Sequence, residues 1–251
     1  MSTAPWKTAL LTGASSGLGR GLATWLAKRD VKVYAAARRL DQLEALRAEA
    51  GPNIVPLKLD VSDSDATFAT VRRLDAECGG LDLVIANAGV GDDTRVKRLD
   101  WESTSRMVQV NVAGATATLC GALPGMVERK RGHLVGISSL AGLVALPSSS
   151  VYCATKAYLA MFLEGLRLDV ERYGLSVTSI HPGFVKSEMT AKNKPEAMPF
   201  LLETDDAVER MGRAMLRRAK VYAFPWQLSS LIASAQALPR PLRTAVLRRL
   251  R

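Results

Sequence analysis

Short apolar runs alternate with longer amphipathic segments along the first 180 residues of the chain. Apolar runs of about four to eight residues are typical of buried strands, and apolar residues spaced three and four apart are typical of helices. We expect strands at 8–11, 31–37, 54–59, 81–86, 133–137 and 176–180, and helices at 17–26, 41–50, 63–78, 100–126 and 151–173. This alternation predicts an α/β fold in which helices cover both faces of a parallel sheet.

The size and composition of the chain fit one globular unit. Its 251 residues are 48% hydrophobic and 23% charged, which is enough apolar material for a large buried core. No linker and no shift in composition interrupts the pattern before residue 190. We therefore expect residues 1–251 to form a single domain.

A glycine-rich turn links the first expected strand to the first expected helix. Gly13 ends the strand, and Gly17 and Gly19 open the helix. Glycines at such positions allow a tight turn and bring backbone amides close to a pyrophosphate at the positive end of the helix. The spacing differs from the general Gly-x-Gly-x-x-Gly fingerprint of dinucleotide sites. The turn is therefore a candidate nucleotide site, with a strand–helix turn that needs glycine only for packing as the alternative.

A tyrosine and a lysine lie four residues apart on the helix expected at 151–173. This spacing places the Tyr152 hydroxyl and the Lys156 amine on one helix face. A phenol has an unperturbed pKa near about 10, so it moves protons efficiently at neutral pH only when a neighbour such as an ammonium stabilises its phenolate. Ser138 and Ser139 end the preceding strand, and strand alternation sends them to opposite faces. The pattern predicts acid–base chemistry at Tyr152.

Several motifs together resemble the short-chain dehydrogenase/reductase family, in order and in spacing, from about residue 7 to about residue 190. The matching residues are Thr12, Gly13, Gly17, Gly19, Asn87, Ala88, Gly89, Asn111, Ser139, Tyr152, Lys156, Pro182 and Gly183. The resemblance implies a Rossmann-type, doubly wound sheet of about seven parallel strands. It also implies a nicotinamide cofactor and hydride transfer between an alcohol and a carbonyl, as in a carbonyl reductase or alcohol dehydrogenase.

The resemblance implies a role for each of four catalytic residues. Tyr152 is expected to be the general acid or base, and Lys156 to lower its pKa and hold the cofactor ribose. The family's thirteen-residue spacing to the tyrosine selects Ser139 as the donor to the developing oxyanion. Asn111 is expected to anchor a water that links Lys156 to solvent. A catalytically idle NADP(H)-binding or scaffold protein and an epimerase of the same family are the alternatives.

The resemblance also implies a set of cofactor contacts. Asp60 and Val61 match the adenine contact, and Val185 and Ser187 match the segment that holds the nicotinamide amide. The other expected contacts are Gly13, Ser15, Ser16, Gly17, Leu18, Gly19, Asn87, Ala88, Gly89, Tyr152, Lys156, Pro182 and Gly183.

Charge at the end of the second strand indicates which cofactor to expect. An acidic residue there accepts hydrogen bonds from the adenosine ribose, whereas a basic one pairs with a 2′-phosphate. Arg38 offers the phosphate a bidentate fork, and there is no acid before Asp41, which favours NADP(H) over NAD(H). Many NADP-preferring relatives also carry a basic residue where this chain has Ser16. A solvated pair, Arg38 and Arg39, is the alternative.

The segment that follows Pro182 and Gly183 shapes the substrate pocket in this family, so we expect residues 185–222 to form a lid region. Its apolar side chains favour a hydrophobic carbonyl or alcohol over a sugar or an acid, although the same residues suit packing of the lid on the body. They are Met189, Met198, Pro199, Phe200, Leu201 and Leu202.

The net charge of +10 lies entirely at the end of the chain. Residues 1–209 hold 24 basic and 24 acidic residues, whereas residues 210–251 hold ten basic residues and no acid. The balanced body argues against a nucleic-acid-binding surface. Residues 223–251 form a basic amphipathic tail, which suits weak contact with an anionic membrane surface. Packing over the pocket and a subunit contact are the alternatives.

Three cysteines and two histidines complete the candidate chemistry. Cys78, Cys120 and Cys153 form no Cys-x-x-Cys pair, and the histidines are too few for most metal sites, so we expect neither disulfides nor metal. No leading signal sequence is recognisable, so we expect a cytoplasmic protein. By resemblance we also expect a homodimer or homotetramer formed through the two long helices.

Overall fold

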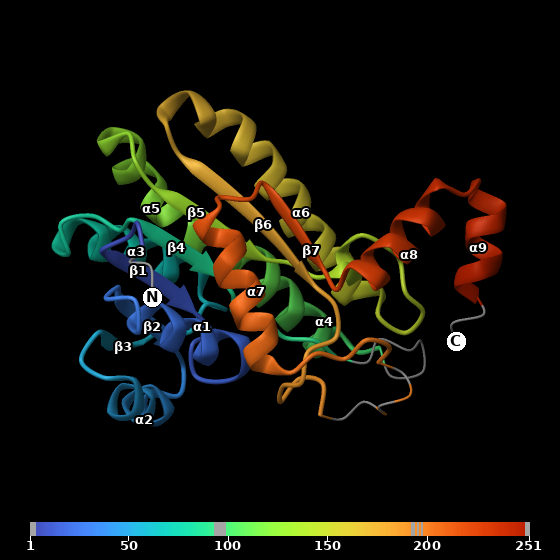
Figure 1. Ribbon diagram of the computed structural model, residues 1–251, viewed down its shortest axis with the longest axis horizontal. Coiled ribbons are helices and arrows are strands. Elements are labelled where there is room, and N and C mark those ends of the chain that lie inside the picture. Colours follow the sequence, from blue (N-terminus) through green and yellow to red (C-terminus); the bar gives the residue numbers. More distant parts are fainter. Residues whose placement is uncertain (1–3, 93–98, 192–193, 195, 197, 249–251) are drawn as a thin grey trace.

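Parallel strands form the centre of the structure, which is a computed structural model describing residues 4–92, 99–191, 194, 196 and 198–248. Within these residues, seven strands form one sheet in the order β3-β2-β1-β4-β5-β6-β7 (Figure 1). The strands are β1 (Thr8–Thr12), β2 (Lys32–Ala37), β3 (Ile54–Lys58), β4 (Leu83–Ala86), β5 (His133–Ile137), β6 (Ser176–Pro182) and β7 (Val221–Phe224). Every pair of neighbours is parallel, which confirms the expected doubly wound α/β fold.

Helices cover both faces of the sheet. They are α1 (Gly17–Ala27), α2 (Leu40–Ala50), α3 (Ser64–Glu77), α4 (Trp101–Val108), α5 (Ala115–Arg129), α6 (Ser150–Val170), α7 (Thr204–Leu216), α8 (Trp226–Ala237) and α9 (Arg240–Arg248), with the short turns η2 (Gln109–Gly114), η3 (Leu140–Gly142) and η4 (Glu171–Tyr173). Residues of α1, α2 and α7 share one buried cluster with the sheet, and residues of α3, α5 and α6 share a second cluster on the other face.

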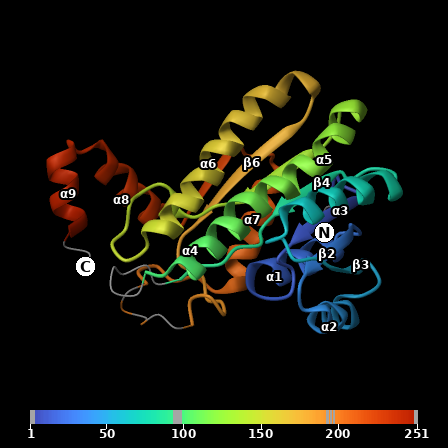
Figure 2. The ribbon, with the colours of Figure 1, turned by 180° about the vertical axis from the view of Figure 1, so that it is seen from behind.

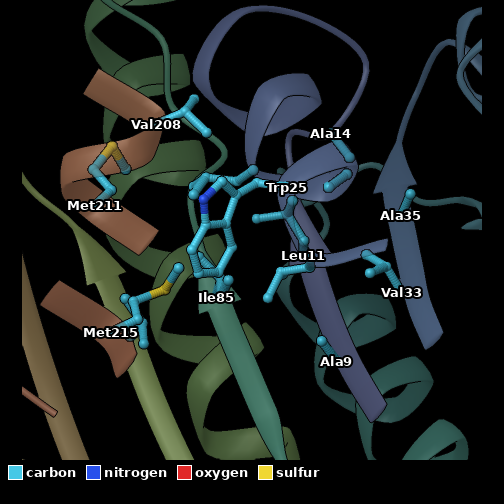
Figure 3. Packing of buried hydrophobic residues seen from close by; sticks show 14 of the residues in the cluster. Ala9, Leu11, Ala14, Trp25, Val33, Ala35, Ile85, Val208, Met211 and Met215 are labelled. Atoms are coloured by element: carbon cyan, nitrogen blue, oxygen red, sulfur yellow. The ribbon is translucent and has the colours of Figure 1, made fainter. Parts of the chain in front are cut away.

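Alternation along β1 supplies both clusters. Ala9 and Leu11 point to the face covered by α1 and α7, whereas Leu10 points to the face covered by α3 and α5. On the first face, Trp25 of α1 fills the space between the sheet and Met211 of α7 (Figure 3). All these side chains are almost wholly buried, so the two helix layers fix the sheet from both sides.

The long helix expected at 100–126 is interrupted. It runs as α4, a π-helical turn η2, and α5, which extends to Arg129. The stretch Trp101–Arg129 is the one described helix that is long and apolar enough to span a membrane, and 56% of its apolar window is buried. Gly114 passes so close to the backbone of Val61 that a side chain there would collide with the carbonyl. These contacts identify a core helix of the fold.

The C-terminal helices α8 and α9 extend away from the sheet, beyond β7 (Figures 1 and 2). The helical spacing of the tail predicts them, and none of the residues of α8 is buried. α8 is attached at its first turn, where Leu228 and the preceding Pro225 lie against Gly183 at the end of β6. The tail is therefore anchored beside the carboxyl ends of the strands.

Buried His133 makes the fold sensitive to acid. Its Nε2 lies 2.8 Å from Thr178 Oγ1, and burial, aided by Arg218, lowers its pKa from 6.5 to about 3. Between these two values the unfolded chain binds a proton that the folded chain excludes, so stability falls as pH drops below 6.5. One such group gives a slope of at most about 1.4 kcal/mol per pH unit.

We therefore expect the free energy of unfolding to fall less steeply with acidification in His133→Gln and His133→Asn than in the parent. Urea unfolding at several pH values between 7 and 4.5 measures the slopes, and the slope, unlike absolute stability, is insensitive to the loss of packing. Equal slopes in all three proteins would refute this role of His133.

Candidate functional site

Ser139 and Tyr152 meet at the carboxyl edge of the sheet. Ser139 directly follows β5, and its Oγ accepts a hydrogen bond from the backbone N–H of Ala141 at 3.1 Å and lies 3.4 Å from the carbonyl of Pro182. Tyr152 is on the first turn of α6. Burial raises the pKa of the Tyr152 phenol above its ordinary value, and a hydrogen bond with the Ser139 side chain partly opposes this rise. The phenol is therefore protonated at neutral pH.

Lys156 lies one turn further along α6 and is almost wholly buried. Its ammonium donates a hydrogen bond to the Ile137 carbonyl at 2.8 Å and lies 5.9 Å from the centre of the Tyr152 ring. Burial lowers the pKa of Lys156 to about 8. The ammonium form thus still predominates at pH 7 and is lost as pH rises through 8.

The two adjacent serines have different partners. Ser138 is buried, and its Oγ donates a 2.8 Å hydrogen bond to the backbone carbonyl of Lys156. It therefore ties α6 to the end of β5, whereas Ser139 faces Tyr152. Behind Ser139, buried His181 lies with Nδ1 3.4 Å from the Ser139 carbonyl and Nε2 2.8 Å from Ser179 Oγ. Burial lowers the pKa of His181, so it is a neutral support for the Ser139 backbone.

Asn111 lies in the π-helical turn η2 and connects three segments. Its Oδ1 accepts the backbone N–H of Val90 at 2.8 Å, and its Nδ2 donates to the Val90 carbonyl at 2.8 Å and to Thr155 Oγ1 at 3.0 Å. A Cβ on Gly89 would lie 3.3 Å from Lys156 Nζ and 3.4 Å from Asn111 Oδ1. Asn111, Gly89 and Lys156 therefore converge, and anchoring of a water by Asn111 stays a prediction.

The glycine turn lies against the residues that follow β4. Gly13 has φ +70°, and a side chain there would meet the backbone of Ala88 at 2.7 Å. Asn87 Nδ2 donates to the carbonyls of Thr12 at 3.0 Å and Gly13 at 3.3 Å, and Thr12 Oγ1 accepts the backbone N–H groups of Asn87 and Ala88. The turn leads into the N-terminus of α1 at Gly17, an arrangement able to bind phosphate.

Asp60 and Val61 follow β3 beside the expected adenosine end of the site. Asp60 Oδ1 accepts hydrogen bonds from the backbone N–H of Ser62 at 3.0 Å and from its Oγ at 2.8 Å, and Val61 is buried. Arg38 is exposed at the end of β2 and lines a cavity of about 460 Å³ with Arg106 of α4. Two arginines and the acidic residue Glu102 thus line this cavity.

Arg39, the neighbour of Arg38 in the basic pair, reaches the glycine turn. Its Nη2 donates to Ser15 Oγ at 3.1 Å and to Ser16 Oγ at 3.0 Å. The only feature of the sequence that could have indicated this contact is the second basic residue of the pair Arg38 and Arg39. Arg39 is the N-cap residue of α2, and its side chain makes no capping hydrogen bond but contacts the turn instead.

The segment after β6 runs from the edge of the sheet to the glycine turn. Gly183 donates its N–H to the Phe224 carbonyl at 2.7 Å, and Val185 is buried and forms a bridge with Leu202. A Cβ on Gly17 would lie 3.4 Å from Ser187 Cβ. The remaining expected contact, Leu18, is half-buried on the first turn of α1. Ser187 thus lies beside the glycine turn, whereas Val185 packs in the core cluster.

Met189 borders the acid–base residues. A Cβ on Gly91 would lie 3.3 Å from the Tyr152 ring and 3.6 Å from Met189 Sδ. Of the expected lid region, residues 204–216 form α7 and residues 221–224 form β7, whereas residues 192, 193, 195 and 197 lie outside the described part. In the described residues, no group of three or more His, Cys, Asp or Glu side chains could hold a metal ion.

Comparison with known proteins agrees with this geometry. Residues 7–197 match the family described as short chain dehydrogenase. An uncharacterized oxidoreductase from Myxococcus xanthus is 56% identical over 254 residues, covering 100% of both chains. A short chain dehydrogenase from Burkholderia cenocepacia solved with NADP has a TM-score of 0.82 and 27% identity, covering 96% of each chain.

A short chain dehydrogenase/reductase from Burkholderia phymatum solved with NAD shares the fold, with a TM-score of 0.82 and 23% identity over 94% of this chain and 95% of that one. Similar structures thus hold either nucleotide. From the matched residues, the sheet order and the residues gathered at its carboxyl edge, the chain belongs to the short-chain dehydrogenase/reductase family of oxidoreductases.

Proposed function

We propose that the protein transfers a hydride between NADP(H) and a carbonyl or secondary alcohol of an apolar substrate. The observation that carries this proposal is the arrangement of Ser139, Tyr152 and Lys156 at the carboxyl edge of the sheet, beside a glycine turn suited to phosphate. In doubly wound folds, this edge is where ligands bind. The catalytic set proposed is Asn111, Ser139, Tyr152 and Lys156.

Proton transfer is the task of this chain's own residues. A bound nicotinamide supplies or accepts the hydride at the substrate carbon. In reduction, the Tyr152 hydroxyl gives its proton to the substrate oxygen while the Ser139 hydroxyl donates a hydrogen bond to the same oxygen. Because burial raises the pKa of Tyr152, the residue is in the acid form needed for reduction at neutral pH. Lys156, as an ammonium, stabilises the phenolate that remains.

The preference for NADP(H) rests on cations at the end of β2. Arg38 and Arg39 follow β2 directly, and Arg39 lies on Ser15 and Ser16 of the glycine turn. A guanidinium there suits a 2′-phosphate. The NADP-bound Burkholderia cenocepacia relative supports this choice, and the NAD-bound relative shows that the fold alone does not determine it. We propose the remaining expected contacts, from Gly13 to Ser187, as the rest of the cofactor site.

The apolar character of the substrate rests on the segment that precedes α7. Met189 borders the Tyr152 ring through Gly91 and is 45% exposed, and Phe200 is also half-exposed. Met198 is buried, and Leu202 packs on the core, so both serve as supports. We propose that residues 185–222 shape the pocket, with the part before α7 contacting substrate.

We propose that the protein is a cytoplasmic homodimer or homotetramer. The described cysteines are all free, as suits a reducing compartment. Tyr158, Met161 and Leu168 form an exposed stripe on α6, and a cavity of about 370 Å³ lies between this helix and Val108. Such a stripe is typical of a subunit contact. Analytical ultracentrifugation tests the proposal, and a monomeric mass at micromolar concentration would contradict it.

We also propose weak contact of residues 223–251 with an anionic membrane surface. Trp226, Leu231 and Leu242 of α8 and α9 are 70%, 62% and 57% exposed, and no acid follows residue 209. Exposed apolar side chains with arginines nearby suit the interface of an anionic bilayer. Residues 249–251, which add two arginines in sequence, lie outside the described part.

Replacing Tyr152 by Phe removes the transferable proton while keeping the ring. We expect kcat/KM for apolar ketones with NADPH to fall by about 10² to 10⁴-fold. Tyr158→Phe is the matched control, because Tyr158 is an exposed tyrosine on the same helix. Turnover by Tyr152→Phe as fast as by the parent, followed at the nicotinamide absorbance, would show the proposed mechanism to be wrong.

Reversing two charges on α9 tests the membrane contact. We expect Arg240→Glu with Arg243→Glu to reduce co-sedimentation with vesicles rich in phosphatidylserine, because each lost cation weakens attraction to an anionic surface. Arg72→Glu with Arg73→Glu on α3 changes the net charge equally and serves as control. Equal pelleting of the parent, both variants and a protein truncated after Pro225 would rule the contact out.

A further inference from the structure

We propose that Glu188 competes with the 2′-phosphate of the nucleotide for Arg39, and so determines how strongly the site distinguishes phosphorylated from unphosphorylated adenosine. This inference rests on the proposed use of NADP(H). It assigns a specificity role to a residue on the substrate side of the site, outside both the glycine turn and the β2–α2 connection.

The contacts around Arg39 join three segments. Arg39 Nη2 lies 3.2 Å from Glu188 Oε2, 3.1 Å from Ser15 Oγ and 3.0 Å from Ser16 Oγ. Arg39 follows β2, the serines belong to the glycine turn, and Glu188 belongs to the segment after β6. Nη2 of Arg39 is therefore within hydrogen-bond distance of one carboxylate and two hydroxyl groups.

In this proposal, a 2′-phosphate at the end of β2 binds Arg39 as well as Arg38, and on Arg39 it uses the same donors. A guanidinium binds phosphate best through two parallel N–H groups, and Nη2 of Arg39 is already directed at the Glu188 carboxylate. The phosphate must displace this carboxylate, which also repels it by like charge. An unphosphorylated ribose does not need the guanidinium and is not opposed in this way. Glu188 thus weakens the binding of 2′-phosphorylated nucleotides selectively.

The pair is exposed enough to exchange partners. The Arg39 and Glu188 side chains are 42% and 65% exposed, so their ion pair is of the weak, solvent-screened kind. The strength typical of such pairs corresponds to about a twofold to fivefold change in a dissociation constant. Glu188 therefore adjusts the discrimination without abolishing binding.

Position in the chain connects this exchange to the substrate side. Ser187 lies against Gly17 of the glycine turn, and Met189 lies near Gly91 beside the Tyr152 ring. Glu188 stands between these two residues. When a 2′-phosphate displaces the Glu188 carboxylate, the ion pair between Arg39 and Glu188 is lost. This removes one contact that holds a segment bordering both the cofactor turn and the acid–base residues.

Glu188→Gln tests the proposal, with Glu203→Gln as matched control. Glu203 forms an ion pair with Lys186 in the same segment, so both variants lose one negative charge there. Isothermal titration at low salt with 2′,5′-ADP and 5′-AMP as probes reads out binding without turnover. We expect Glu188→Gln to bind 2′,5′-ADP about twofold to fivefold more tightly than Glu203→Gln does, with 5′-AMP unchanged and the gain reduced by added salt.

Other outcomes overturn the inference in distinct ways. If both variants bind 2′,5′-ADP equally more tightly, Glu188 acts only through its general negative charge. If Glu188→Gln binds 2′,5′-ADP and 5′-AMP more tightly by the same factor, the effect does not involve the 2′-phosphate. An unchanged Kd in Glu188→Gln would also refute the competition. If the parent protein itself binds 2′,5′-ADP no more tightly than 5′-AMP, the proposed NADP(H) preference is what fails.

Discussion

The burial of the Lys156 ammonium is the constraint on which the site depends. A charge taken out of water must be compensated, and the Ile137 carbonyl accepts its hydrogen bond at 2.8 Å. Two neighbouring residues accommodate the Lys156 side chain. Gly89 leaves room beside Nζ, and Ser138 holds the Lys156 backbone against β5. Because β5 and α6 are fixed by the parallel sheet, the ammonium is held beside Tyr152.

Asn111 extends this constraint to the end of β4. From the π turn η2, its amide binds both polar groups of the Val90 backbone and Thr155 on α6. Apolar spacing predicts one helix over 100–126 because a single π turn barely alters the periodicity of its apolar face. The helix was therefore predictable from the sequence, and the interruption that positions Asn111 was not.

Sequence patterns predict those parts of the structure that neighbouring residues along the chain determine. The ends of the expected strands agree with the structure to within about two residues. Short apolar runs bounded by turn residues identify such strands from the local sequence alone. The side-chain direction of Arg39, its contact with Glu188 and the outward course of α8 depend on segments far apart in sequence. The spacing of Ser139, Tyr152 and Lys156 was readable because one strand end and one helix carry all three.

Burial acts on Tyr152 and Lys156 in opposite directions, and this ties the chemistry to pH. It raises the pKa of the phenol and lowers that of the ammonium to about 8, since both charged forms lose hydration. Below pH 8 the phenol keeps its proton and the amine of Lys156 is charged. Above pH 8 the amine of Lys156 loses its proton and its charge. At neutral pH the site therefore holds a neutral phenol and a charged ammonium side by side.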